Sequence, residues 1–410
     1  MKTYQDLLDV GEDEKQRIDF IRQAINEHKS SPAYQFAVDA ELYFKGENPT
    51  INRYEKIIYD LQGRAHRDMY TANHKIASSF FGFDVRQEVS YLLGNGVTFQ
   101  EEATKKRLGK KFDLMMVKAA RYALIAGVSF GLFNLDHVDV FKLAEFAPLY
   151  DEENGALMAG VRFWQVAEDK PLRATLYEVD GYTDYIQRKD EDMTVLEEKR
   201  TYIQQVRTSP ADGTEIYAGQ NYPSFPIVPL RNGEDALSEL VGKRNTLDAL
   251  DLCTSNMVNN VDEGNLIYWV LQNAGGMDDL DDQKFLDKVR TTHIVHAGSV
   301  EDEGATAEPH TIEAPFQGTD ATINMLKRKL YEDFQAFDSS AVSAGNQTAT
   351  AIEASYTPLD LKADDFEASV TEFILGLLAA AGIDDEPSYT RSRIINRSEE
   401  TQMILMGADY

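Results

Sequence analysis

The chain is poor in cysteine and in basic side chains, and it lacks a long hydrophobic run. Cys253 is the only cysteine among 410 residues, which excludes an intrachain disulfide and a zinc site built from several thiolates. With 41 Lys and Arg against 69 Asp and Glu, the formal net charge is −28. This deficit argues against a general basic coat for nucleic acid, because neutralising phosphates requires clustered bases.

No stretch reaches the roughly 18 apolar residues of a membrane span. The longest apolar run, Phe373–Ile383, is better interpreted as a buried or interface helix. The first six residues lead into acidic positions instead of an apolar signal segment. We therefore expect a chain that is neither secreted nor membrane-embedded, and its cysteine content suits a reducing compartment.

Signatures of catalysis and nucleotide binding are scarce. There is no Gly-Lys-Ser or Gly-Lys-Thr to cradle phosphates, and no His-Glu-x-x-His. His293 and His296, with His310 beyond, are the only histidine cluster, and Cys253 is expected to be a small buried hydrophobe. Carboxylate pairs such as Asp281 and Asp282 arise by chance in so acidic a chain. We predict no enzyme, metal site or cofactor, with a carboxylate-based hydrolase as a remote alternative.

Hydrophobic spacing divides the chain into a helical part, a β part and a second helical part. Early helices are predicted over Glu12–Ser30, Lys75–Leu93 and Lys110–Ala126. Short strands are predicted at Val97–Phe99 and Val128–Asn134, and an antiparallel β region between Val138 and Pro229. Proline cannot continue a central strand, so this region should close at Phe225–Pro229.

Two long helices, from Ala236 to about Asn260 and over Asp320–Phe337, then bracket an acidic insertion. A loop of small polar residues follows at Ser339–Thr350, and a loop of this composition is either disordered or functional. A last helix is predicted from Ala351 to about Ala381, kinked at Pro358. A strand and a short helix should complete the chain.

Several motifs occur in an order typical of one protein family. They are Tyr43–Gly46, Asn73–Phe99 with its Tyr91-Leu92-Leu93-Gly94 turn, Ala126–Phe130, Ala147–Asp151, Phe225–Asn232, Leu247–Asp251 and Gly345–Ile352. Each motif alone is weak, but their order over nearly the whole chain resembles the portal proteins of tailed double-stranded DNA bacteriophages, of the siphovirus type. Thr350 departs from the glycine-rich neighbourhood that the family usually has there.

The resemblance implies an α+β portal-type subunit with an α/β wing, a two-helix stem, a small α/β clip, a kinked long helix and a reduced C-terminal crown. The implied divisions are the wing at 1–237, stem helix 1 at 238–267, the clip at 268–319, stem helix 2 at 320–337, the tunnel loop at 338–350, the kinked helix at 351–382 and the crown at 383–410.

The resemblance also implies a function. Portals form ring oligomers, dodecameric in the virion, at one capsid vertex, and double-stranded DNA passes through them in packaging and ejection. The expected partners are further copies of the chain, DNA, the terminase large subunit, a head-tail connector protein, and the major capsid and scaffolding proteins. The chain would be found in the virion, and in the host cytoplasm during assembly. A closer alternative is another ring-forming virion structural or scaffold protein.

Candidate site residues follow from the same resemblance. The side chains expected to face DNA from the tunnel loop are Ser339, Ser340, Ser343, Asn346, Gln347 and Thr348. Stem bases Lys327, Arg328 and Lys329 either form rings near the duplex or lie on a solvent or inter-subunit salt-bridge face. Partner contacts in the clip are expected from Asp278, Asp279, Asp281, Asp282, Glu301, Asp302 and Glu303. An acidic wall with small polar contacts suits a channel that must release DNA, because each neutralised phosphate adds attraction.

Overall fold

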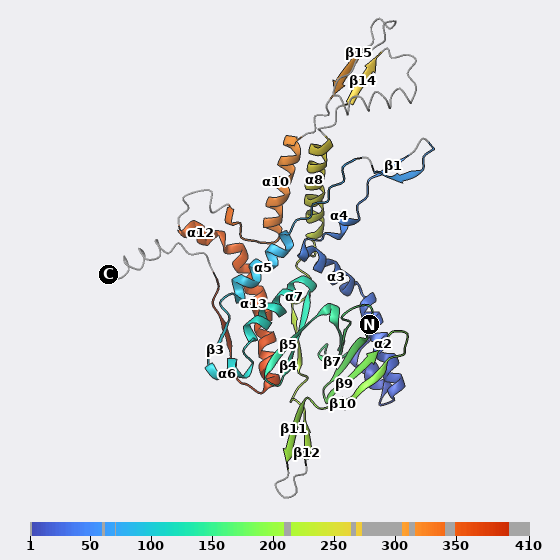
Figure 1. The fold of residues 1–410 in the computed structure, drawn as a ribbon. Coiled ribbons are helices and arrows are strands. Elements are labelled where there is room, and N and C mark those ends of the chain that lie inside the picture. The colour runs from blue at the N-terminus through green and yellow to red at the C-terminus, as the bar shows by residue number, and fades with distance from the viewer. Residues whose placement is uncertain are drawn as a thin grey trace, which may run out of the picture. The chain divides into compact units, whose positions relative to one another are not determined.

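The computed structural model describes residues 2–59, 62–69, 71–208, 215–263, 268–272, 306–310, 316–340 and 349–392. These residues form helices and antiparallel sheets, as the predicted α+β class requires (Figure 1). The chain divides into two compact units. Unit 1 comprises 1–49, 78–247 and 329–410, and unit 2 comprises 50–77 and 248–328.

Three helices open unit 1: α1 (Tyr4–Val10), α2 (Glu14–Ser30) and α3 (Pro32–Lys45). The Asp13 side chain accepts a hydrogen bond from the Gln16 amide at the start of α2, so the predicted helix at 12–30 is confirmed. Ser31 ends α2 and caps α3, whose first position is Pro32. Gly46, at φ 77°, ends α3 in the left-handed conformation that glycine adopts readily.

The largest sheet is antiparallel, with the strand order β10-β9-β8-β7-β6. Its strands are β6 (Phe146–Tyr150), β7 (Leu157–Trp164), β8 (Leu172–Glu178), β9 (Gly181–Gln187) and β10 (Thr194–Arg200). One face packs against α2, where Phe20, Ile21 and Ile25 join a buried cluster with strand residues. In β7, Gly160 lies against the Phe146 ring, and a Cβ there would be 2.1 Å from that ring. Only glycine fits this contact.

A second sheet has three strands in the order β13-β4-β5, and helices α7 (Phe112–Ala126) and α13 (Thr357–Ala381) pack against it to form the helical layer of unit 1. The sheet consists of β4 (Val128–Asn134), β5 (His137–Lys142) and β13 (Ile227–Arg231), with the short 3-10 helix η1 (Leu143–Glu145) after β5. Helix α7 packs against β4 and β5, and α13 against β13 and β4. Gly131 of β4 admits the Phe373 ring of α13, because a Cβ there would be 2.5 Å from it.

The predicted end of the β region was wrong in one respect. Strand β13 runs through Pro229, which pairs with Phe130, and ends at Arg231. Strand β13 lies at one edge of its sheet. Proline has no backbone N–H, and on the outer side of an edge strand no neighbouring strand requires one. The remaining antiparallel pairs are β1 (Ile57–Tyr59) with β2 (Ala65–Arg67), β11 (Ile203–Thr208) with β12 (Glu215–Gln220), β14 (Tyr268–Gln272) with β15 (Thr306–His310), and β3 (Val97–Phe99) with β16 (Pro387–Tyr389).

The helix predicted at Lys75–Leu93 begins later, as α5 (Phe80–Leu93). Residues 72–79 are not helical, and side chains of α8 (Arg244–Glu263) bond two of their backbone amides. The His74 amide donates to Asn259 Oδ1 at 2.7 Å, and the Ile76 amide donates to Ser255 Oγ at 3.0 Å. Of the other early helices, α4 is Pro49–Arg53 and α6 is Glu102–Arg107, and Gly127, at φ 88°, ends α7 as predicted.

The long helices also differ from their predicted bounds. Residues 236–243 form turns before α8 begins at Arg244, and α10 covers Phe316–Asp333 instead of Asp320–Phe337. The continuous helix predicted from Ala351 was wrong, because α12 (Ala349–Ser355) ends before Tyr356 and α13 then begins anew. Pro358 occupies the first turn of α13, where no amide donor is needed, so it starts a helix and does not kink one.

A buried ion cluster joins the helical layer of unit 1. The Lys362 ammonium on α13 lies 3.0 Å from Asp84 Oδ2, 2.9 Å from Glu88 Oε2 and 3.2 Å from Glu239 Oε1. It also donates to the carbonyl of Phe334, after α10, at 3.1 Å. Lys243 pairs with Glu239 from the other side. Four chain segments therefore meet at one ammonium group.

The cluster holds three carboxylates and two ammonium groups, so it carries one excess negative charge when fully ionised. Burial raises the pKa of Glu88 to about 8 and that of Asp84 to about 6, although Lys362 opposes both shifts. Burial also disfavours the charge on Glu239, but Lys362 and Lys243 lower its pKa overall. Glu88, which is fully buried, is therefore the group that takes up a proton.

We expect Lys362→Met to destabilise unit 1 by roughly 3–5 kcal/mol, because it leaves buried carboxylates without their cation. The melting temperature by scanning calorimetry measures this loss. Lys327→Met, at an exposed position of α10, is the matched control and should melt close to the wild type. Similar melting temperatures for both variants would contradict the expectation.

Replacing Glu88 with Gln should change how stability depends on pH. Folded Glu88 keeps its proton up to about pH 8, whereas its ordinary pKa is 4.5, so the wild type loses stability as pH rises between these values. The melting temperature of Glu88→Gln relative to wild type should therefore rise from pH 5 to pH 8, by the equivalent of roughly 1–3 kcal/mol.

Calorimetry at several pH values measures this trend, with Glu198→Gln on the exposed face of β10 as the control. A difference between Glu88→Gln and wild type that stays constant from pH 5 to pH 8 would count against a protonated Glu88.

Candidate functional site

The residues that flank the small polar loop are held together by aromatic stacking. Phe337 before the loop and Tyr356 after it stack with ring centroids 4.0 Å apart and an interplanar angle of 10°. Tyr91 of α5 also stacks with Tyr356, with ring centroids 5.7 Å apart and an interplanar angle of 14°. All three rings are at most 5% exposed. The residues on either side of the segment 338–355 thus meet at one place.

Hydrogen bonds also fix the backbone at the base of the loop, by which we mean the stacked rings of Phe337, Tyr356 and Tyr91. The Gln87 side chain accepts from the Phe337 amide at 2.8 Å and donates to the Phe337 carbonyl at 2.9 Å. These two bonds satisfy both backbone groups of Phe337 just beyond α10, where no helical partner remains. The position at which the loop begins is therefore set by a side chain of α5.

An arginine after β16 fixes the start of α13. Arg391 bonds to Asp360 at 3.2 Å and to Glu367 at 2.9 Å, and it also pairs with Asp364. Its guanidinium lies 5.8 Å from the centroid of the Tyr91 ring. Burial opposes the charge on Arg391, but its hydrogen bonds to Glu367 and Asp364 raise its pKa overall. The guanidinium of Arg391, held by these carboxylates, thus lies next to the Tyr91 ring of the aromatic stack.

Of the predicted tunnel-loop residues, the structure describes Ser339 and Ser340, and both are exposed. Ser340 donates to Asp338 Oδ1 through its amide at 2.9 Å and through its hydroxyl at 2.6 Å. The other four predicted contacts lie outside the described residues: Ser343, Asn346, Gln347 and Thr348. The described part of the loop presents hydroxyl groups next to the aromatic base.

The predicted stem bases Lys327, Arg328 and Lys329 all lie on α10 and are exposed. Lys329 pairs with Asp333 one turn later, at 2.9 Å, which is a helix-surface salt bridge. All seven predicted clip carboxylates lie outside the described residues: Asp278, Asp279, Asp281, Asp282, Glu301, Asp302 and Glu303. Of the predicted clip at 268–319, the structure describes β14, β15 and residues 316–319, which already belong to α10.

The described residues hold no assembled metal site. Among them no group of three or more His, Cys, Asp or Glu side chains is placed to hold a metal, and His293 and His296 lie outside them. The half-buried Cys253 on α8 is more accessible than predicted. No helix in the described ranges is long and apolar enough to cross a membrane.

A Gly-x-Ser-x-Gly sequence does occur, at Gly127–Gly131, but it does not form a nucleophile elbow. Such an elbow is a turn from a strand into a helix, whereas here a helix, α7, leads into a strand, β4. Ser129 is fully buried, and its hydroxyl donates to the Ala119 carbonyl at 2.8 Å. The serine therefore stabilises the packing of α7 on β4.

Tyr356→Ala should remove the central ring of the stack and cost roughly 3–5 kcal/mol of stability. Tyr356→Phe keeps both stacking contacts and should lose far less, so it serves as the matched control. Thermal unfolding of the two variants measures the difference. Equal losses would mean that the hydroxyl, not the stacked ring, holds the base of the loop.

Comparison with known proteins gives one consistent family. The family described as "Phage portal protein, SPP1 Gp6-like" matches residues 37–407. The portal protein of Bacillus phage SPP1 is 23% identical over 421 residues, covering 94% of this chain and 79% of that protein. The portal protein of Clostridium phage phiCD119 is 25% identical over 196 residues, covering 46% of this chain and 43% of that protein.

A solved chain in the neck of a native GTA particle, computed with C12 symmetry, is similar over 79% of this chain and 84% of its own length, with 10% identity and a TM-score of 0.41. The family match covers most of the chain and agrees with the ordered motifs found in the sequence. The chain belongs to the SPP1 Gp6-like family of phage portal proteins.

Proposed function

We propose that this phage portal protein is one subunit of a ring, most simply a dodecamer, that forms the channel for double-stranded DNA at one capsid vertex. The match to the portal family over residues 37–407 carries this proposal. Within the ring, residues 1–237 act as the wing, 238–267 and 320–337 as the stem, 268–319 as the clip, and 383–410 belong to the crown. The segment 338–350 is the tunnel loop, and residues 351–382 return the chain to the wing.

The charge of the chain supports this function. A channel that conducts DNA must not hold it, and a subunit with a net charge of −28 gives a ring that repels phosphates. The exposed hydroxyls of Ser339 and Ser340 provide weak, neutral contacts to the backbone. The stacked base fixes where the loop emerges, so equivalent loops in a symmetric ring are presented at the same height.

The partners follow from that role. The ring docks the terminase large subunit during packaging and a head-tail connector protein afterwards, and it contacts the capsid and scaffolding proteins. It assembles in the host cytoplasm and remains in the virion. The portal family is a structural one, and we propose that this chain has no catalytic activity and needs no cofactor.

Light scattering and negative-stain electron microscopy of the purified protein test the proposal. We expect rings of about a dozen subunits with a central hole of roughly 20 Å or more. The hole must admit a DNA duplex, and the major groove of B-DNA alone is ~12 Å wide. A compact small oligomer without a channel would contradict it.

Adding positive charge to the loop should make the ring retain DNA. Each Ser340→Lys subunit adds one ammonium group, and together these raise duplex affinity and its dependence on salt. Fluorescence anisotropy with a short duplex should show at least about tenfold tighter binding at low salt than for wild type, lost again near 0.2 M salt. Ser340→Ala is the control. Unchanged binding by Ser340→Lys would place this segment away from DNA.

A further inference from the structure

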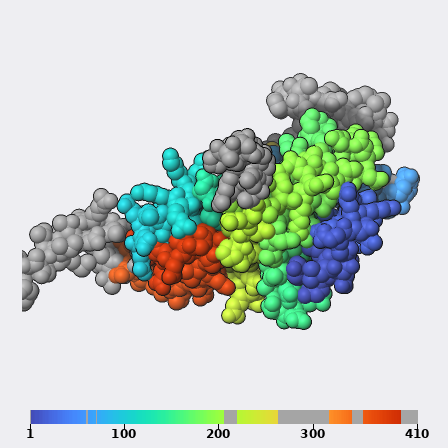
Figure 2. Space-filling model, turned by 90° about the horizontal axis from the view of Figure 1, so that it is seen from below, coloured from blue at the N-terminus to red at the C-terminus, as the bar shows by residue number. Residues whose placement is uncertain are grey.

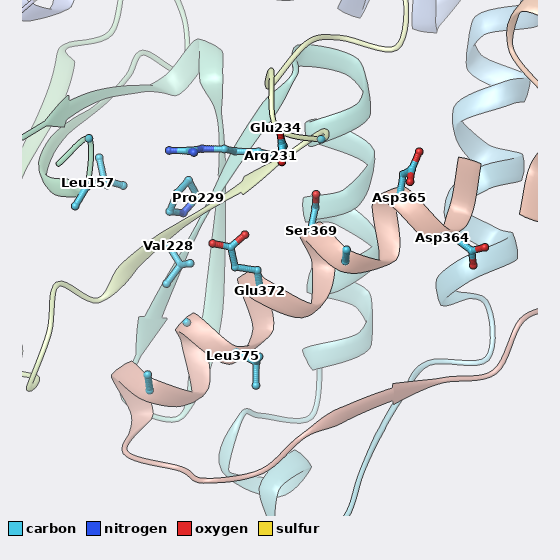
Figure 3. A pocket seen from close by; sticks show the side chains of 16 residues that line it. Leu157, Val228, Pro229, Arg231, Glu234, Asp364, Asp365, Ser369, Glu372 and Leu375 are labelled. Carbon is cyan, nitrogen blue, oxygen red and sulfur yellow. The ribbon is translucent and has the colours of Figure 1, made fainter. Parts of the chain in front are cut away.

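A wide groove runs along unit 1 beside α13, and its volume is about 1210 Å³. Figure 3 shows Ser369 and Glu372 of α13 along one side, and Pro229 and Arg231 of β13 along the other. The volume exceeds the 300–1,000 Å³ of typical small-molecule sites. A groove of this size suits a segment of polypeptide better than a metabolite.

Among the described residues, no element covers the α13 face next to this groove. Exposed residues recur every three or four positions along it: Leu361, Asp365, Ala368, Glu372, Leu375 and Ala379. Leu361 is 59% exposed and Leu375 is 42% exposed, whereas the opposite stripe is buried in the core. The two leucines, with Ala368 between them, give an apolar component to a solvent-facing stripe that also carries Asp365 and Glu372.

Negative charge dominates the groove. Its lining contains four carboxylates, from Asp364, Asp365, Glu372 and Glu234, against one guanidinium, from Arg231. Asp364 already pairs with Arg391. In the described part of the chain the other three carboxylates have no ion-pair partner, so they outnumber the single guanidinium of Arg231 and the groove keeps a net negative charge of two. Its occupant should therefore be cationic, with an apolar side chain among its charges.

The same chain carries a complementary surface between α6 and α7. Five of the seven residues 105–111 are Lys or Arg, although the whole chain has a net charge of −28. Lys105 pairs with Asp113, and Arg107 donates to the Ala381 carbonyl. The remaining bases are exposed and make no ion pair within the described residues, and beside them Leu114 is 60% exposed. We call Lys106, Lys110, Lys111 and Leu114 the basic turn.

The two surfaces are carried by different elements of unit 1. In Figure 2 the segment that contains α6 (cyan) abuts helix α13 (red), and Arg107 of α6 donates to the carbonyl of Ala381 at the end of α13. Identical subunits that join unlike surfaces make a heterologous contact, which closes into a ring when the rotation permits. A groove beside α13 and a basic turn between α6 and α7 are the two halves of such a contact.

We propose that the groove beside α13 binds the basic turn of a second copy of this chain, forming the head-to-tail interface of the ring. Lys106, Lys110 and Lys111 of one subunit pair with Asp365, Glu372 and Glu234 of the next, and Leu114 packs against the leucine stripe of α13. This inference rests on the proposed ring function, and it adds the surfaces by which the ring closes.

Charge reversal on either surface tests the interface. Lys110→Glu/Lys111→Glu and Asp365→Lys/Glu372→Lys should each weaken ring formation at least about tenfold by native mass spectrometry. An equimolar mixture of the two variants should recover rings with alternating subunits, because every contact then joins opposite charges. Recovery on mixing also shows that both variants are folded. Lys189→Glu and Glu168→Lys, on exposed turns elsewhere, are matched controls and should assemble like wild type.

The outcomes separate the interface from the function. Wild-type rings with unaffected charge-reversal variants would overturn the interface, assign the basic turn to another partner and leave the portal function standing. Variants that fail alone and also fail when mixed would equally overturn it. A wild-type protein that forms no ring under any assembly condition would overturn both proposals.

Discussion

The helical layer of unit 1 depends on one buried ammonium group. Lys362 of α13 contacts two carboxylates of α5, a third on the turn before α8, and a backbone carbonyl after α10. A buried charge is tolerated only if it is paired and hydrogen-bonded, so each of these segments must be in place for the others to be stable. Apolar packing alone would bring the helices together but would specify their register less strictly.

Sequence patterns predicted the elements that local chemistry decides. Gly127 ends α7 because it can adopt a positive φ, and the alternating runs after Val138 form the antiparallel sheets. The errors occurred where distant contacts decide the conformation. The backbone amides of His74 and Ile76 donate to side chains of α8 and not to a helix of their own. Pro229 lies within a strand because that strand is at the edge of its sheet.

The ordered motifs predicted the family, but they say little about which contacts support the loop. Lys362 did carry a signal, because it interrupts an apolar stripe at Leu359, Ala363 and Phe366, and a charge at such a position requires partners. Asp84 and Glu88, four residues apart on the buried face of α5, carry the matching signal. The stack of Phe337, Tyr356 and Tyr91 had none, since nothing in the spacing of three aromatic residues so far apart indicates contact.

The stacked base has an evolutionary consequence. Because Phe337 and Tyr356 meet directly, the number of residues between them can change without altering the register of α13 or the end of α10. Doubling the length of a loop costs only about 0.6 kcal/mol in closure entropy. Insertions and deletions between Ser340 and α12 are therefore nearly neutral for folding. Selection can adjust the length and composition of the loop while the scaffold stays constant.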